Sequence, residues 1–273
     1  MIPLRSLLSR LTTLSAPAAA LVLAGCCCTT PRSAAVPPNT KGESLFDGKT
    51  LHGWAGLPGH WLVKEGAITG YTTAVSPLKQ NTFLVWTNGT VSNFELHFKY
   101  RIHGGNSGVQ YRSELMDPAQ FVVGGYQADI DATPRYTGIL YEERGRGILC
   151  ERGQRTLVKD VNGKTEIKVV GTLGTPEALQ KFIRSEDWND YTIVAKGNQV
   201  LHFINGHLMS DCVDLGAKAP HEGILALQIH VGPPMQVQFK DLVLYRLPDT
   251  KPDNGLPLPK SAPAAAKPAS TTK

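Results

Sequence analysis

The chain has 273 residues, of which 41% are hydrophobic and 19% charged, a composition that allows one large globular domain without disulfide or metal staples. Its formal charge of +5 comes from scattered basic residues, and the absence of a Lys/Arg cluster with interleaved aromatic residues argues against nucleic-acid binding. The sequence has no CxxC pair and no zinc-type cysteine spacing, which argues against a structural zinc site.

The first 25 residues predict an export signal of the lipoprotein type. Arg5 and Arg10 give a positive start, and the apolar stretch behind them is too short for a convincing membrane-spanning helix. The stretch ends in Leu23-Ala-Gly-Cys26, which is similar to a bacterial lipobox, where cleavage before Cys26 precedes attachment of lipid to its sulfur. An ordinary signal peptide cut near Ala24 is the alternative. The lipoprotein interpretation predicts a lipid anchor in the bacterial cell envelope, on either side of a membrane.

Segments of low apolar content flank the folded region. Residues 26–42 are predicted to be a flexible tether and residues 249–273 a disordered Pro/Ala/Lys tail, because neither can bury enough apolar surface to offset its ordering entropy. The folded domain is therefore predicted over residues 43–248. Cys150 and Cys212 are its only cysteines. We expect them to be unpaired, although export would also allow a disulfide.

Alternating apolar and polar residues predict a series of strands joined by tight turns. Gly197-Asn198 and Asn205-Gly206 suit such turns because both pairs tolerate positive φ. Many antiparallel strands over about 200 residues indicate an all-β fold, an antiparallel β-sandwich or jelly roll. The clearest alternation covers residues 94–102, 191–195, 200–204 and 237–245.

A charged segment and a short helix interrupt the strand pattern. The helix is predicted over residues 175–183, with Thr175 as its cap and Pro176 in its first turn. Residues 141–155 are dense in charge and glycine and are predicted to form a loop at the rim of a groove. The arginines of this loop either attract an anionic ligand or, as is commoner, are solvated: Arg144, Arg146, Arg152 and Arg155.

Three segments would place polar side chains together, because the side chains of a strand alternate between its two faces. In residues 225–230 the alternation buries Leu225, Leu227 and Ile229 and turns Gln228 and His230 outward. Residues 109–114 and 126–131 repeat the arrangement. If these strands are neighbours, they form a polar surface of carbohydrate size from Gln110, Arg112 and Glu114 and from Gln127, Asp129 and Asp131.

Six motifs occur in a fixed order along the chain, at residues 44–54, 105–108 with Arg112, 137–141, 187–191, 202–206 and 223–230. Together they resemble the 3-keto-disaccharide hydrolase domain, which is abundant in exported bacterial proteins. The resemblance implies a concanavalin A-like or laminin G-like sandwich with a concave sugar-binding face. It also implies cleavage of glycosides whose sugar has first been oxidised at carbon 3, so that a separate sugar 3-oxidoreductase would supply the substrate.

The ordinary glycosidase mechanism fits this sequence poorly. It needs two carboxyl groups flanking the bond, one as acid and the other as nucleophile or base. Retaining glucanases with this kind of sandwich carry Glu-x-Asp-x-(x)-Glu on one strand, and the nearest match here begins with Gln127, a neutral amide that cannot serve as nucleophile. Glu114, Glu142 and Glu143 remain alternative carboxylates.

A 3-keto sugar needs only one base, because the ketone acidifies the hydrogen on carbon 2. The resulting enolate expels the group on carbon 1, and water then adds. His230 or Asp129 is the candidate base, Arg112 the candidate stabiliser of the enolate, and Tyr141 or Glu142 the candidate proton donor. No cofactor is certain. A divalent cation held by Asp129, Asp131 and His230 is a possible replacement or assistant for Arg112.

The candidate substrate contacts each have a structural alternative. Asn106 and Ser107, which lie between glycines, could simply shape a turn, and Asp131 could cap a loop. His202 is as compatible with a solvated sheet face as with catalysis. Since fold alone does not assign activity, a non-catalytic, lectin-like glycan-binding domain is the alternative function. The remaining candidate substrate contacts are Gln110, Glu114, Gln127 and Gln228.

Overall fold

A computed structural model describes residues 40–248 of the chain. The predicted export signal, Cys26, nearly all of the 26–42 tether and the 249–273 tail lie outside the described residues and stay predictions. Within residues 40–248, no helix is both long and apolar enough to cross a membrane.

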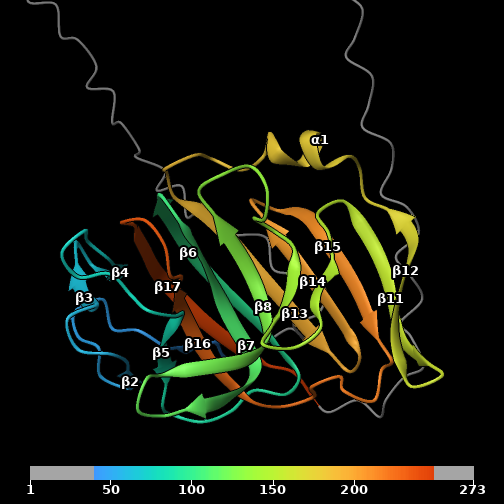
Figure 1. The fold of residues 1–273 in the computed structure, drawn as a ribbon, viewed down its shortest axis with the longest axis horizontal. Helices are drawn as coiled ribbons and strands as arrows, with labels where there is room; N and C mark the ends of the chain where they lie inside the picture. Colours follow the sequence, from blue (N-terminus) through green and yellow to red (C-terminus); the bar gives the residue numbers. More distant parts are fainter. Residues whose placement is uncertain (1–39, 249–273) are drawn as a thin grey trace, which may run out of the picture. The chain divides into compact units, whose positions relative to one another are not determined.

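The described region is a sandwich of two β-sheets (Figure 1). The ten-stranded sheet contains β1 (Glu43–Ser44), β3 (Trp61–Lys64), β4 (Ala67–Tyr71), β6 (Phe94–His103), β11 (Gln154–Val161), β12 (Lys164–Thr172), β13 (Asn189–Lys196), β14 (Gln199–Ile204), β15 (His207–Asp214) and β17 (Gln236–Arg246). Its order is β12-β11-β15-β14-β13-β6-β17-β4-β3, and β1 pairs with β17.

The seven-stranded sheet contains β2 (Trp54–Ala55), β5 (Thr82–Trp86), β7 (Asn106–Asp117), β8 (Val122–Asp131), β9 (Leu140–Glu143), β10 (Gly147–Cys150) and β16 (Ile224–Ile229). Its order is β10-β9-β8-β7-β16-β5-β2. In both sheets the described strand pairs are antiparallel except β11 with β15. The predicted all-β antiparallel sandwich is therefore confirmed, with one parallel pair added.

The strands and the helix predicted from the sequence pattern are present. The four clearest alternating segments form β6, β13, β14 and β17. Asn205 and Gly206 adopt positive φ in the turn between β14 and β15, and Gly197 does so between β13 and β14. The helix α1 covers Pro176–Gln180, shorter than predicted, and the Thr175 side chain accepts a hydrogen bond from the Ala178 amide as its cap.

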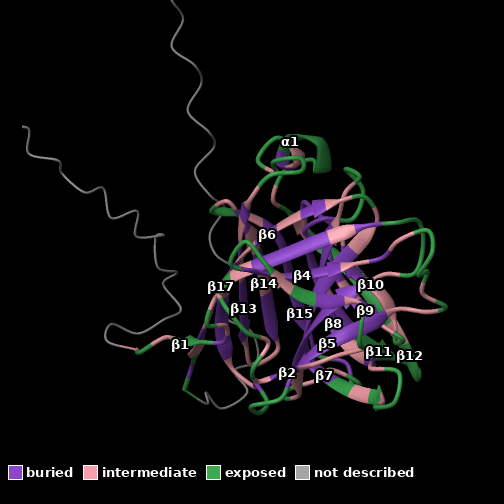
Figure 2. Ribbon diagram, turned by 90° about the vertical axis from the view of Figure 1, so that its left-hand side faces the viewer, coloured by how far each residue is buried: buried purple, intermediate pink, exposed green. Residues whose placement is uncertain are grey.

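The core lies between the two sheets, where the inward side chains of both are buried (Figure 2). Aromatic rings fill much of it: Phe98 stacks on Tyr191 with ring centroids 5.1 Å apart, and Phe94 of β6 meets Tyr111 of β7 edge-on at 5.7 Å. The second contact joins the two sheets directly. The core faces of both sheets are mainly apolar, so a polar side chain that points inward must find a hydrogen-bond or ion-pair partner there.

The charged segment over residues 141–155 is mostly paired strand, which corrects the predicted solvated loop. It contributes to β9, β10 and the start of β11. Arg152 and Arg155 are buried, and Arg146 lies in a buried ion-pair network, so only Arg144 of the four arginines is exposed. A buried guanidinium needs hydrogen-bond acceptors, which Arg152 finds in the carbonyls of Pro134, Thr137 and Pro176.

Candidate functional site

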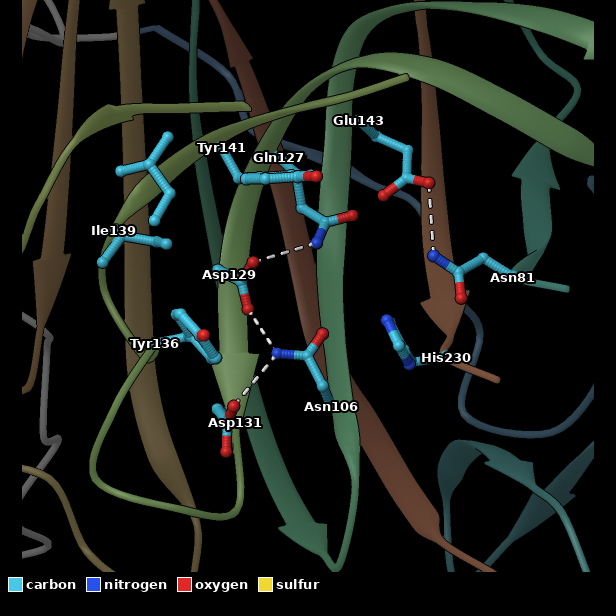
Figure 3. Close-up of a pocket in the computed structure, with 11 residues that line it drawn as sticks. Asn81, Asn106, Gln127, Asp129, Asp131, Tyr136, Ile139, Tyr141, Glu143 and His230 are labelled. Carbon is cyan, nitrogen blue, oxygen red and sulfur yellow. Dashed lines mark hydrogen bonds between the residues drawn. The ribbon is translucent and has the colours of Figure 1, made fainter. Parts of the chain in front are cut away.

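A cavity of about 450 Å³ opens on the face of the seven-stranded sheet that points away from the ten-stranded sheet (Figure 3). Its size is within the range of roughly 300–1,000 Å³ that holds small organic ligands. Strands β7, β8 and β9 form its floor, with contributions from residues next to β5, β9 and β16. The lining residues are Asn81, Asn106, Gln127, Asp129, Asp131, Tyr136, Ile139, Tyr141, Glu143, Ile148 and His230.

Strand β8 supplies the polar centre of the cavity by simple alternation. Tyr126, Ala128 and Ile130 point into the core, so Gln127, Asp129 and Asp131 point the other way. The predicted shared face of Gln127, Asp129 and Asp131 is therefore confirmed. Strand β7 is the neighbour of this face, with Gly108 directly opposite Asp129, and the Gln127 side chain fills the space that a side chain at position 108 would take.

Asp129 is a carboxylate held at the cavity floor by two amides. Its Oδ1 accepts a hydrogen bond of 2.7 Å from Asn106 Nδ2, and its Oδ2 accepts one of 3.2 Å from Gln127 Nε2. The residue is only 5% exposed, and this burial raises its pKa from 3.8 to about 7 in spite of the two bonds. The nearby charges of Asp131 and Glu143 act in the same direction.

Strand β9 places Tyr141 and Glu143 beside Asp129. Burial, followed by the charges of Glu143 and Asp129, raises the pKa of the Tyr141 hydroxyl above 10, so this phenol stays protonated at neutral pH. Glu143 accepts hydrogen bonds from Asn81 Nδ2 at 3.2 Å and from Gln228 Nε2 at 3.4 Å. The cavity thus combines an acid that titrates near neutrality with a neutral hydroxyl donor and a second carboxylate.

His230 follows the end of β16 and lines the opposite wall of the cavity (Figure 3). Its ring Nδ1 lies 2.5 Å from the carbonyl oxygen of Val231, to which it donates. This bond makes Nε2 the unprotonated nitrogen of the neutral ring. Across the cavity, Asp131 accepts hydrogen bonds from Asn106 at 3.3 Å and from the Thr133 amide at 2.6 Å. Asp131 therefore both lines the cavity and caps the following loop.

Arg112 is not in the cavity, which corrects the predicted enolate stabiliser. The register of β7 with β8 shifts between Tyr111 and Glu114, and Arg112 itself has φ of +48°. This β-bulge breaks the alternation, so Arg112 does not share the outer face of Gln110. Its guanidinium instead donates to the carbonyls of Ser92, Gly197 and Pro220 at 2.6, 2.8 and 3.4 Å. Glu114, beyond the bulge, is exposed and does not line the cavity.

Glu142 also lies away from the cavity, because alternation in β9 turns it to the opposite face from Tyr141 and Glu143. Its carboxylate accepts bonds of 2.6 and 2.9 Å from the Arg146 guanidinium, which also contacts Asp214 at 2.6 Å. Tyr126 donates to the same Asp214. The predicted role of Glu142 as proton donor is therefore wrong, since its carboxylate is buried in an ion pair that joins the two sheets.

Three other predicted substrate contacts are buried beneath the cavity. Ser107 donates to the Gln228 carbonyl at 2.6 Å, and the amides of Gln110 and Gln127 lie 2.7 Å apart. Ser107, Gln110 and Gln228 are fully covered, so they support the cavity floor without lining it. Gln228 points to the outer face as predicted, but Glu143 and Gln127 cover it, so it is buried.

His202 lies in the core, contrary to both interpretations of the sequence. It is fully buried, with Nε2 2.8 Å from the Tyr111 hydroxyl and Nδ1 3.2 Å from the Ile139 carbonyl. Desolvation lowers its pKa to about 3, so the ring is neutral in the folded protein. It is Leu201 and Phe203, its apolar neighbours in β14, that face the partly exposed side.

The predicted metal ligands do not come together. Among residues 40–248, no three His, Cys, Asp or Glu side chains are placed to hold a metal ion jointly. Asp129 and Asp131 are both engaged by Asn106, while His230 is on the other side of that amide (Figure 3).

The sequence interpretation missed part of the cavity wall. Glu143 was named only as an alternative carboxylate, although a strand that presents Tyr141 must also present the residue two positions later. Asn81 and Tyr136 come from loops, where no periodicity indicates a direction. Ile139 and Ile148 supply an apolar wall, and neither stands out in a strand pattern.

A family model for the 3-keto-alpha-glucoside-1,2-lyase-like domain matches residues 41–244. The chain belongs to this family. The resemblance inferred from the ordered motifs is confirmed, and membership of a 3-keto-alpha-glucoside-1,2-lyase-like family implies a carbohydrate substrate. No curated protein matches the chain.

Several solved structures match the chain at low sequence identity. A protein of Parabacteroides distasonis ATCC 8503, provisionally named a glycosyl hydrolase, matches with 17% identity and a TM-score of 0.51, over 76% of this chain and 100% of that one. A carbohydrate-binding module from Bacillus subtilis matches with 16% identity and a TM-score of 0.46, over 71% and 95%. A beta-glucanase of Bacillus licheniformis matches with 11% identity and a TM-score of 0.41, over 77% and 99%.

Proposed function

We propose that this member of the 3-keto-alpha-glucoside-1,2-lyase-like family cleaves 3-keto-glycosides by abstracting the proton on carbon 2, eliminating the substituent on carbon 1 and adding water. The observation that carries the proposal is the buried carboxyl of Asp129, which titrates at about 7 on the floor of a sugar-sized cavity. A general base is most effective when its pKa lies near the working pH. An ordinary surface aspartate, with a pKa near 3.8, would be a much weaker base.

In the proposed first step, ionised Asp129 takes the carbon 2 proton and the carbon–hydrogen electrons form the enolate of the 3-keto group. Asn106 and Gln127 hold both carboxylate oxygens in place, so the base is oriented before the substrate arrives. The negative charge then develops on the ketone oxygen. With Arg112 outside the cavity, the neutral Tyr141 hydroxyl is the proposed hydrogen-bond donor for this oxygen.

In the second step, the enolate re-forms its carbonyl, a carbon 1–carbon 2 double bond appears and the bond from carbon 1 to the glycosidic oxygen breaks. The leaving oxygen needs a proton, for which His230 in its protonated form or Tyr141 is the proposed donor, both lining the cavity. Water then adds to carbon 1 and a proton returns to carbon 2. The sum of these steps is hydrolysis, and stopping before water addition gives a lyase.

The substrate must come from a preceding oxidation of a glycoside at carbon 3, since unoxidised sugars lack the acidic carbon 2 hydrogen. The proposal also places the domain in the bacterial cell envelope, held by lipid on Cys26. Support for this location is the lipobox-like Leu23-Ala-Gly-Cys26 sequence alone.

Incubation of the purified chain with 3-keto-glucosides and their unoxidised parents, with and without a chelator, tests the proposal. Release of the aglycone from the keto substrates only is expected. Asp129→Asn should lower kcat by a factor on the order of 10²–10⁴, the usual contribution of a general base. Asp241→Asn, which changes an exposed aspartate outside the cavity, is the matched control and should retain full activity.

The pH dependence separates the base from a merely structural Asp129. Since the ionised carboxylate is the active form, kcat should rise with pH through about 7, and this limb should vanish in Asp129→Asn. A loss of less than tenfold in the variant would refute the assignment. Absence of release from every substrate, together with saturable glycan binding, would instead establish the lectin-like alternative.

A further inference from the structure

Strand β12 is an exposed edge of the ten-stranded sheet (Figure 1). It pairs with β11 on one side, and no described strand pairs with its other side. Each of its nine residues is exposed or half-buried. A long edge strand of this kind offers a row of backbone donors and acceptors to another chain, and natural proteins usually protect such edges.

Apolar residues make this edge unusual. Ile167 lies opposite the fully buried Val158 of β11, and Val169 lies opposite the buried Thr156, so both point to the core-facing side of the sheet. They are nevertheless 40% and 53% exposed. On the other face, Glu166 and Lys168 flank Ile167 in the sequence and are exposed. One face of the edge therefore carries the apolar Ile167 and Val169, and the other carries Lys164, Glu166 and Lys168.

In one register this pattern joins both its opposite charges and its apolar residue. In an antiparallel pair, two residues that lie opposite each other point to the same face of the sheet. If two copies of β12 pair around a two-fold axis, this condition holds only when the axis passes through one residue, which then lies opposite the same residue of the other copy. Centring on Ile167 places Glu166 opposite Lys168 twice and Ile167 opposite itself. A shift by one residue in either direction places Glu166 opposite Glu166, or Lys168 opposite Lys168. Centring on Thr165 would also pair Lys164 with Glu166, but it places Ile167 opposite Gly163 in the β11–β12 turn.

We propose that β12 pairs with β12 of a second copy of this chain, antiparallel and centred on Ile167, to form a two-fold dimer. The two ten-stranded sheets then become continuous across the axis. The pairing places Ile167 opposite Ile167 and Val169 opposite Thr165 on the core-facing side, and it forms two Glu166–Lys168 ion pairs on the other side. Such an interface is isologous, as in most homodimers.

Sedimentation velocity over a concentration series, at low salt, tests the dimer. The wild-type chain should shift from monomer to dimer as concentration rises. Glu166→Lys or Lys168→Glu places like charges opposite each other, and either variant should weaken association at least tenfold. The double exchange E166K/K168E restores two opposite-charge pairs and should restore association. Lys64→Glu, on β3 at the other end of the same sheet, is the control and should behave as wild type.

The double exchange also separates the dimer from an effect within the β11–β12 hairpin. Lys159 lies opposite Glu166 in that hairpin, so Lys at position 166 repels Lys159 in both the single and the double variant. If Glu166→Lys prevented association only by disturbing the β11–β12 hairpin, the double variant would therefore also remain monomeric. The proposal would be overturned if the wild-type chain remained monomeric at all concentrations or if the double variant did not recover association. The edge of β12 would then be available to pair with a different protein or with residues 249–273.

Discussion

Asp129 shows how one buried carboxyl sets both the chemistry and the stability of the domain. The unfolded chain ionises this group near 3.8 and the folded chain near 7, because burial disfavours the carboxylate. Between these values the folded state holds a proton that the unfolded state has lost. The contribution of Asp129 therefore makes the domain less stable as pH rises from 3.8 to about 7. Above about pH 7 the group is ionised in both states, and its contribution to stability no longer changes.

Asp129→Asn should remove this pH dependence. Relative to wild type, the variant should gain about 4 kcal/mol in free energy of unfolding between about pH 4 and about pH 7. This figure is the pKa difference between the folded and unfolded states multiplied by about 1.36 kcal/mol per pKa unit. Denaturant unfolding at a series of pH values measures the difference. Parallel curves for the two proteins would show that Asp129 ionises at its ordinary pKa.

His202 should act in the opposite direction over an overlapping pH range. Its pKa is about 6.5 in the unfolded chain and about 3 in the folded core, so stability is lost as pH falls below 6.5 and the unfolded state gains a proton. His202→Gln, which keeps a hydrogen-bonding side chain for Tyr111, should flatten this loss by up to about 5 kcal/mol. The same unfolding series measures it, and an unchanged acid slope would contradict the buried neutral ring.

At the scale of the element, β7 shows why alternation alone misplaces a side chain. Its bulge at Arg112 re-aims the guanidinium from the cavity to carbonyls in three separate segments: Ser92 before β6, Gly197 between β13 and β14, and Pro220 before β16. Arg112 is 3% exposed, so these bonds are sheltered from water. Arg112 consequently stabilises the sandwich by holding three of its connecting segments together.

Arg112→Met should therefore reduce stability with little effect on catalysis. Loss of the guanidinium leaves several carbonyls without a donor, at a cost on the order of 2–4 kcal/mol. We expect a lower melting temperature and, below it, a kcat/KM on 3-keto-glucosides within threefold of wild type. A hundredfold or larger loss of kcat, in a variant that remains folded, would instead show that Arg112 takes part in catalysis.

At the scale of the whole molecule, the reactivity of Cys150 and Cys212 can show whether the two sheets stay packed together. Cys150 of β10 and Cys212 of β15 are free, as predicted, and each is 1% exposed, in a different sheet. Burial raises the pKa of the Cys150 thiol to about 11 and that of Cys212 well above its usual value. Both the low exposure and the low thiolate fraction oppose reaction with electrophiles.

Alkylation of Cys150 and Cys212 should accordingly require the sheets to separate. Iodoacetamide labelling, followed by peptide mass spectrometry to distinguish Cys26, Cys27 and Cys28, should give one common slow rate for the two buried cysteines. That rate should increase with denaturant with the slope of global unfolding. Rapid labelling of either thiol in the native protein would reveal a local opening at its strand.

The sequence by itself determined the fold class, the family and the centre of the site. Strand alternation is a local property, so β6, β13, β14 and β17 could be predicted from it, as could the shared face of Gln127, Asp129 and Asp131 on a regular strand. The ordered motifs indicated the family without any structure. These results depend only on neighbours along the chain.

Only the tertiary structure decided which polar residues reach the cavity. A bulge turned Arg112 away, and the opposing sheet covered His202. Asn81 and Tyr136 reach the cavity from loops whose paths depend on the whole sandwich. In each case the direction of the side chain is set by contacts between distant segments, and the same contacts desolvate Asp129 and raise its pKa.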